Sequence, residues 1–197
     1  AGQRALKGAA LSLLSTLGSK HETRIEAAFN EASTMTTRLA ALTALSSIET
    51  ETFDRALAAF ESRWSDSPLV MDKWFGVQAM SIRGDIRERL AKLAARPDYD
   101  LKNPNRVRAL VAAFSMSNPV AFHAADGWGY RFLVDVIVQV DALNPALSAR
   151  LCTAFESWRA FDAPRRREAE AQQKRLADAG LSKNAQDIIG RALAQPG

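Results

Sequence analysis

The side chains with the clearest chemical potential in this sequence are two histidines, one cysteine and the carboxylate beside the first histidine. A zinc-protease helix carries two histidines four residues apart, and the glutamate that follows the first acts as general base. His21 and Glu22 match the first half of that pattern, but Ile25 occupies the position of the second histidine. Ser19 and Glu22 instead have the spacing of a capping box, which predicts the start of a helix.

Other signatures of catalysis are also missing from the sequence. His123 and Cys152 lie far from His21 along the chain, so these residues have no spacing typical of a metal site. The sequence has no Gly-x-Ser-x-Gly elbow, no phosphate loop and no dinucleotide fingerprint. The loop 127–129 (Gly-Trp-Gly) is too short for a nucleotide, and we expect it to supply a turn with positive φ. We therefore predict no catalytic residue, metal ligand or cofactor within this chain.

The one run of basic residues, 165–167, has two interpretations. Arg165–Glu168 and Arg166–Glu170 have the spacing of ion pairs on one helix, which predicts an ordinary solvated face. A binding surface for an acidic partner or for nucleic acid over residues 159–175 is the alternative. The net charge of +4, from 26 basic and 22 acidic residues, is mild. A dedicated nucleic-acid binder is more basic, so we expect no nucleic-acid partner.

Two further arginines lie at the edges of apolar stripes. Arg150 follows Leu147 by three residues, and Arg108 directly follows Val107. A charge beside a packed face requires a partner or a wet cavity. A structural ion pair or a side chain that extends into solvent satisfies that requirement as well, so both interpretations stay open.

The elements that would position these residues are helices. The 197 residues are 47% hydrophobic, which is typical of a globular protein, and abundant Ala and Leu favour helix. Apolar residues recur at helical spacing, as in Phe53, Leu57, Phe60 and Trp64, and again at positions 147, 151, 155 and 158. We expect helices at 3–17, from 19, from 34, at 50–64, from 68, and at 85–95, 104–115, 119–124, 128–143, 145–161, 163–178 and 182–193.

Local signals set several of these boundaries. The pairs Asn103-Pro104, Asn118-Pro119 and Asn144-Pro145 place Asn at a helix N-cap and Pro at the first helical position. Residues 128–143 contain a β-branched run that would suit a strand. The apolar residues of that run step by three and four, so we predict a buried, central helix.

These features predict an all-α fold, an α-solenoid or superhelical array of about twelve short antiparallel helices like armadillo or HEAT repeats. Because no Gly- or Ser-rich linker interrupts the sequence, we expect a single domain over 1–197. A single cysteine excludes an internal disulfide and fits a reducing compartment. No signal peptide or membrane-spanning run is visible, so we expect a cytoplasmic protein without a membrane partner.

With these residues in place, the sequence resembles the C-terminal helical domain of the bacterial aminopeptidase N family, the zinc-dependent alanyl aminopeptidases. The resemblance covers most of the chain and is weakest before residue 20 and after residue 160. The matching residues are 35–36 and 39–42 (MT, LAAL), 69–75 and 78–79 (LVMDKWF, QA), 103–106 and 108 (NPNR, R), and 118–119, 121–123, 126–127, 129–130 and 132–134 (NP, AFH, DG, GY, FLV).

This resemblance implies an accessory role inside a larger enzyme. In that family the zinc ligands, the general base and the residues that hold the substrate amino terminus lie in an upstream catalytic domain. The C-terminal domain packs over that domain, encloses the active-site cavity and limits the access of peptides. We therefore expect the chain alone to be inactive, to begin after the true start of its domain, and to contact the catalytic and N-terminal domains of the same polypeptide.

The resemblance also implies which residues line the substrate cavity. Arg108 and Arg150 match arginines that face the cavity and meet peptide carboxylate or carbonyl groups, and Phe122, His123 and Tyr130 are expected beside them. Trp128 stands where the family has a small residue. The alternative is a free-standing helical-repeat scaffold that binds a protein partner along a concave face.

Overall fold

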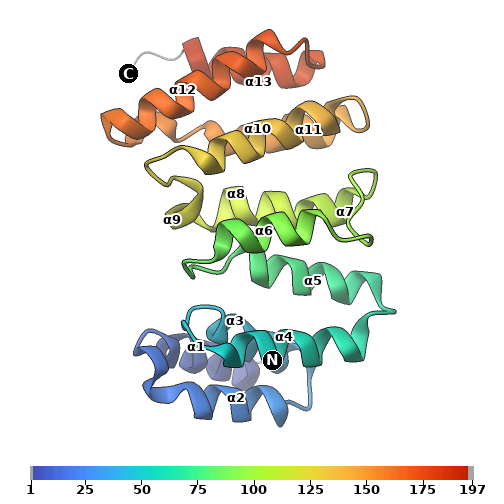
Figure 1. The fold of residues 1–197 in the computed structure, drawn as a ribbon, viewed down its shortest axis with the longest axis vertical. Coiled ribbons are helices and arrows are strands. Elements are labelled where there is room, and N and C mark those ends of the chain that lie inside the picture. Colours follow the sequence, from blue (N-terminus) through green and yellow to red (C-terminus); the bar gives the residue numbers. More distant parts are fainter. Residues whose placement is uncertain (1, 195–197) are drawn as a thin grey trace. The chain divides into compact units, whose positions relative to one another are not determined.

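The computed structural model describes residues 2–194, and all regular structure in that range is helical. The chain divides into two compact units, Ala1–Leu93 and Ala94–Gly197. Within each unit, consecutive helices pack side by side (Figure 1). The predicted all-α, solenoid-like class is therefore confirmed.

The first unit is built around α3, which packs against α1, α2, α4 and α5. Ile25, Leu42, Phe53, Phe60 and Phe75 are fully buried in its core. Its elements are α1 (Gly2–Ser15), the 3-10 turn η1 (Gly18–His21), α2 (Glu22–Asn30), α3 (Met35–Leu45), α4 (Glu51–Trp64), α5 (Pro68–Ala79) and α6 (Ile86–Ala94).

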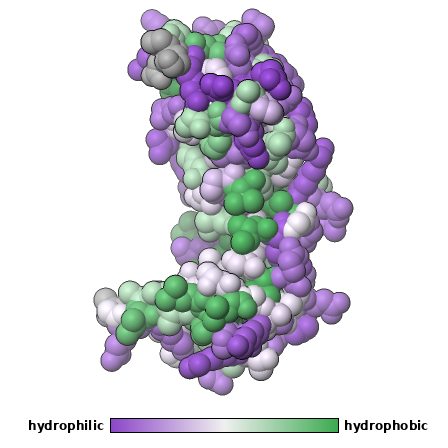
Figure 2. All heavy atoms as spheres, turned by 90° about the vertical axis from the view of Figure 1, so that its left-hand side faces the viewer, coloured by the Kyte–Doolittle hydropathy of each residue, from purple (hydrophilic) through white to green (hydrophobic). Residues whose placement is uncertain are grey.

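The outer face of α1 carries exposed leucines. Leu6 and Leu13 on α1 are 73% and 70% exposed, and Leu17, just beyond the helix, is 59% exposed. Their spacing of seven and four residues places them on one side of the helix. Figure 2 shows a hydrophobic strip along this segment at its lower left.

The second unit is centred on α10, which packs against α9, α11 and α12, while α13 packs against α11 and α12. Phe114, Phe122, Leu133, Ile137 and Phe155 are among its fully buried residues. Its elements are α7 (Pro104–Val107), the π-helical turn η2 (Arg108–Ala112), α8 (Ala113–Ser117), α9 (Pro119–Phe122), α10 (Trp128–Asp141), α11 (Pro145–Cys152), the 3-10 turns η3 (Thr153–Phe155) and η4 (Trp158–Ala160), α12 (Ala163–Asp178) and α13 (Lys183–Ala194).

The three Asn-Pro helix starts are confirmed. The side chain of Asn103 accepts hydrogen bonds from the N–H groups of Asn105 and Arg106. Asn118 and Asn144 accept from the N–H group three residues on, at 3.3 and 3.0 Å, and each is followed by Pro at the first helical position. The valine-rich segment is also helical, as predicted, and α10 buries one broad face while Asp135, Val138 and Gln139 stay exposed.

Three local predictions are wrong. Ser19 and Glu22 form no capping box, because Ser19 lies inside η1 and α2 begins at Glu22 without a side-chain cap. A hydrogen bond from Thr52 engages the Glu22 carboxylate instead and lowers its pKa. The sequence also predicts Ser182 as the N-cap of the helix at 182–193, but its hydroxyl donates to Asp141 at 2.7 Å instead.

The third error is the expected helix at 145–161, which stops at Cys152 and continues as two 3-10 turns. These turns let Phe155 and Trp158 both face inward, and the Trp158 indole donates to the Ala192 carbonyl at 3.3 Å. The helix predicted at 104–115 runs from 104 to 117, but its middle is the π-helical turn η2.

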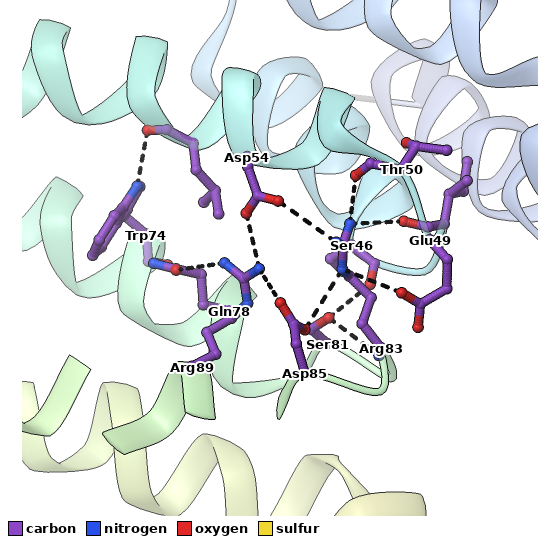
Figure 3. Close-up of polar contacts among 12 residues, drawn as sticks. Ser46, Glu49, Thr50, Asp54, Trp74, Gln78, Ser81, Arg83, Asp85 and Arg89 are labelled. Carbon is purple, nitrogen blue, oxygen red and sulfur yellow. Dashed lines mark hydrogen bonds and ion pairs between the residues drawn. The ribbon is translucent and has the colours of Figure 1, made fainter. Parts of the chain in front are cut away.

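A network of charged side chains fastens the loop before α6 to the N-terminal end of α4 (Figure 3). The Arg83 guanidinium donates to the carbonyl oxygens of Ile48 and Thr50 at 3.0 and 2.6 Å. It also lies 3.5 Å from the Asp54 carboxylate and 3.6 Å from the Asp85 carboxylate. Only 10% of the Arg83 side chain is exposed, whereas Asp54 and Asp85 are 48% and 40% exposed, so solvent partly screens these ion pairs.

Arg89 completes the network from α6. Its guanidinium contacts Asp54 at 2.8 Å and Asp85 at 2.6 Å, so the two arginines share both carboxylates. Both guanidinium groups also lie over the ring of Phe53, at 5.6 Å for Arg83 and 5.2 Å for Arg89. The network therefore links α4, α6 and the loop between α3 and α4 through ion pairs and hydrogen bonds.

We predict that Arg83→Met lowers the free energy of unfolding by about 2–4 kcal/mol, because the carbonyl oxygens of Ile48 and Thr50 lose their donor and two carboxylates lose their partner. Arg55→Met is the matched control. Its side chain is 60% exposed and pairs with Glu26 at 3.2 Å, so its loss costs about 0–1 kcal/mol. Urea unfolding of both variants measures the difference. If the two variants lose the same free energy of unfolding, the Arg83 network does not stabilise the first unit as proposed.

Candidate functional site

Three of the predicted site residues lie together in an aromatic cluster of the second unit. The ring of Phe122 is 4.8 Å from that of His123 and 5.2 Å from that of Tyr130, measured between centroids. Phe114 and Phe155 lie behind Phe122 at 5.7 and 6.3 Å. Phe122 and Tyr130 are buried, so in this chain they support His123 rather than form a surface themselves.

The turn between α9 and α10 sets this geometry. Gly127 has φ +67°, the left-handed value that the sequence predicted for this loop. A Cβ on Gly129 would lie 2.4 Å from the carbonyl oxygen of Phe122, so α10 starts directly against the backbone of α9. Trp128 points away from this contact and stacks on Phe114 at 5.1 Å. The turn therefore accommodates the tryptophan without displacing either glycine.

Hydrogen bonds fix the position of His123. Its Nδ1 lies 2.9 Å from the Tyr130 hydroxyl, and Arg165 Nε donates to the His123 carbonyl oxygen at 2.6 Å. Burial, aided by the charge of Arg165, lowers the pKa of His123 to about 4. Burial also raises the pKa of Tyr130 to about 12. Both side chains are therefore neutral at pH 7, and the pair is suited to hydrogen bonding rather than to proton transfer.

One edge of His123 opens onto a hollow of about 420 Å³. The ring of Phe161 lies 4.0 Å from the His123 ring and forms part of its wall. The lining combines apolar and polar side chains, which is the usual character of a ligand pocket. Its residues are Ser115, Met116, Pro119, His123, Thr153, Ala154, Glu156, Ser157 and Phe161.

Arg108 and Arg150 are exposed and lie outside the aromatic cluster. Arg108 is the first residue of the π-helical turn, and its guanidinium donates to the Asn105 side chain at 3.2 Å. Arg150 lies on α11, and its carbonyl accepts from the hydroxyl of Thr153, which lines the hollow. Within residues 2–194 neither guanidinium has a carboxylate partner. π-Helical turns are frequent at functional sites.

Sequence reasoning missed other residues of this region. The buried arginine of α7 is Arg106, which is 4% exposed and pairs with Asp98 at 3.2 Å. Arg165 was expected on a solvated face, but it contacts the Asp162 carboxylate and the His123 backbone.

The ion pairs predicted along α12 are also wrong. Glu168 pairs with Arg131 of α10 at 3.3 Å, and Glu170 pairs with Lys174 at 2.7 Å. These partners lie on another helix or in the following turn, so spacing alone could not select them.

The described part of the chain offers little for metal or thiol chemistry. Among residues 2–194, no group of three or more His, Cys, Asp or Glu side chains is placed to hold a metal ion. Cys152 is fully buried, and burial raises its thiol pKa to about 12, so it is protonated and unreactive at pH 7. No helix in this range combines the length and apolar character that a membrane span requires.

Comparison with known proteins gives the family. The model of the DUF3458_C family, described as a domain of unknown function with ARM repeats, matches residues 1–194. The chain belongs to this family. The predicted armadillo-like architecture is therefore confirmed.

Two curated relatives are similar in sequence to almost the whole chain. Aminopeptidase N of Caulobacter vibrioides is 37% identical over 195 residues, which are 98% of this chain and 23% of the relative. Aminopeptidase N of Escherichia coli (strain K12) is 35% identical over 195 residues, or 98% of this chain and 22% of the relative. The resemblance to a C-terminal domain of aminopeptidase N is thereby confirmed.

A solved structure of another aminopeptidase is similar to this chain in fold and sequence. The crystal structure of Legionella pneumophila aminopeptidase A in complex with aspartic acid matches with a TM-score of 0.83 and 32% identity, over 89% of this chain and 21% of that chain. The chain thus spans less than a quarter of the length of the curated relatives and of this structure.

The low pKa of His123 predicts a pH dependence of stability. The imidazole titrates near 6.5 when unfolded and near 4 when folded. Between these values the unfolded chain binds more protons, so the free energy of unfolding falls as pH is lowered from 6.5 to 4. His123→Gln, which keeps a neutral polar group, should flatten that slope in denaturant unfolding measured across this window. If the free energy of unfolding depends on pH equally in the two proteins, folding does not lower the pKa of His123.

Proposed function

We propose that this family member serves as the C-terminal domain of a zinc-dependent aminopeptidase, which removes amino-terminal residues from peptides. The observation that carries the proposal is the alignment of 98% of this chain with less than a quarter of two aminopeptidase N relatives. In this proposal the zinc and the reacting groups lie in another part of the polypeptide. This domain encloses the cavity around them and limits which peptides enter.

The leucine face of α1 supports contact with another domain. Leu6, Leu13 and Leu17 are all more than half exposed, and Figure 2 shows the hydrophobic strip in this region. A contiguous apolar strip of this kind typically marks an interaction surface. We assign it to the catalytic and N-terminal domains of the same polypeptide. We further propose that both compact units act as one domain, since the family match runs through residues 1–194.

The arginines give the domain a means to recognise peptides. Arg108 and Arg150 are exposed and lack carboxylate partners among the described residues. A guanidinium stays charged and presents a fork of donors that fits a carboxylate or a backbone carbonyl. In this proposal both face the peptide beyond its first residue, and His123, which the buried Phe122 and Tyr130 support, forms the adjacent wall. The enzyme is expected in the cytoplasm, with peptides as ligands and no nucleic acid or membrane.

We predict that Arg150→Ala in the longer polypeptide lowers kcat/KM for a peptide of several residues by about tenfold, the equivalent of one charge-assisted hydrogen bond. Hydrolysis of a single-residue alanyl amide should change less than about twofold, because that substrate does not extend to Arg150. Steady-state kinetics with both substrates measures how far the substitution lowers kcat/KM for the peptide and for the amide.

Arg55→Ala is the charge-matched control for this experiment. Arg55 is exposed, pairs with Glu26 and lies outside the proposed cavity lining. Its kinetics should match those of the unmodified enzyme with both substrates. If Arg150→Ala slows the amide as strongly as the peptide, Arg150 has a structural role and the proposed peptide contact is wrong.

A further inference from the structure

A second hollow of the same unit is surrounded by arginines. It has a volume of about 270 Å³ and lies between the turn η4 and the first part of α12. Three of its six lining residues are arginines, and one is acidic. They are Trp158, Arg159, Ala163, Arg166, Arg167 and Glu170.

Arg159 is held in place before any ligand arrives. Its Nη1 donates to the Ala192 carbonyl, and its Nη2 donates to the Leu193 carbonyl at 2.9 Å. The guanidinium also lies over the ring of Trp158, 4.2 Å from the centroid. A guanidinium has five N–H donors, so three remain for a ligand. Ordering Arg159 therefore adds little to the entropic cost of binding.

Arg166 and Arg167 supply unpaired charge at the same hollow. Both are exposed on α12, and neither has a carboxylate partner within residues 2–194. Two carboxylates lie nearby: Asp162 pairs with Arg165 and Glu170 pairs with Lys174 at 2.7 Å, and their charges also act on Arg166 and Arg159 respectively. Because its lining holds three arginines and one glutamate, the hollow keeps an excess of positive charge that these carboxylates neutralise only in part.

We propose that this hollow binds a phosphoryl group, either as free inorganic phosphate or as part of a small phosphorylated molecule. A phosphate has several acceptor oxygens and up to two negative charges, and converging guanidinium groups match both features. A carboxylate would bind less tightly because it offers one charge and two oxygens. This inference is independent of the proposed aminopeptidase role.

The test uses the indole N–H of Trp158, which donates to the Ala192 carbonyl and lies under Arg159. Inorganic phosphate is titrated into the 197-residue chain at constant ionic strength, with chloride as the balancing anion, and the ¹H–¹⁵N resonance of this indole is followed. Arg166→Gln and Arg167→Gln are compared with Arg175→Gln. Arg175 lies on the same helix, and its charge is already paired with Asp135 at 2.7 Å, so the control changes net charge equally.

The proposal predicts a saturable shift of the indole resonance. The Kd for phosphate obtained from this shift should rise about tenfold in each of the two hollow variants and less than about twofold in Arg175→Gln. A parallel titration with adenosine monophosphate distinguishes the sources, because tighter binding than phosphate indicates a phosphorylated small molecule. A shift that chloride reproduces, or equal weakening in all three variants, would overturn the site. A response to RNA but not to either small anion would overturn it as well.

Discussion

The helices of this protein are too short to be stable alone, and every other property of the structure depends on how their faces are covered. Its longest helix, α12, has 16 residues, and α11 has eight. Isolated helices of this length are marginal in water, so tertiary packing must stabilise them. In the second unit α10 provides that cover, because it buries residues against α9, α11 and α12. In the first unit α3 has the same role, and the Arg83–Arg89 network anchors the α3–α4 and α5–α6 loops.

The same packing sets the protonation state of the side chains that could take part in chemistry. The histidine with the best surroundings, His123, is held neutral by burial and hydrogen-bonded to a neutral tyrosine. The single cysteine is buried and protonated. Exposed arginines at positions 108, 150, 166 and 167 carry charge on helical segments that packing already orders. A scaffold of this kind can shape a cavity and hold anionic or carbonyl groups beside it.

The sequence predicted well wherever one short segment decides the structure. Asn118 and Asn144 cap their helices because cap and recipient lie three residues apart. The helical period of residues 128–143 likewise outweighed the strand preference of its valines. Prediction failed where a distant segment competes: Thr52 engages Glu22, Asp141 takes the Ser182 hydroxyl, and Arg131 takes Glu168. No local pattern encodes the π-helical turn at Arg108, or the two hollows, which gather residues from several elements.

We propose that this domain shapes access to a reaction that residues elsewhere in the polypeptide perform. The most direct test is hydrolysis of an alanyl chromogenic amide by the 197-residue chain, with and without added zinc, beside the longer polypeptide. Circular dichroism first establishes that the chain is folded and helical. We predict turnover by the longer polypeptide and none above the buffer rate by the chain at any zinc concentration. Zinc-dependent hydrolysis by the folded chain alone would contradict the account.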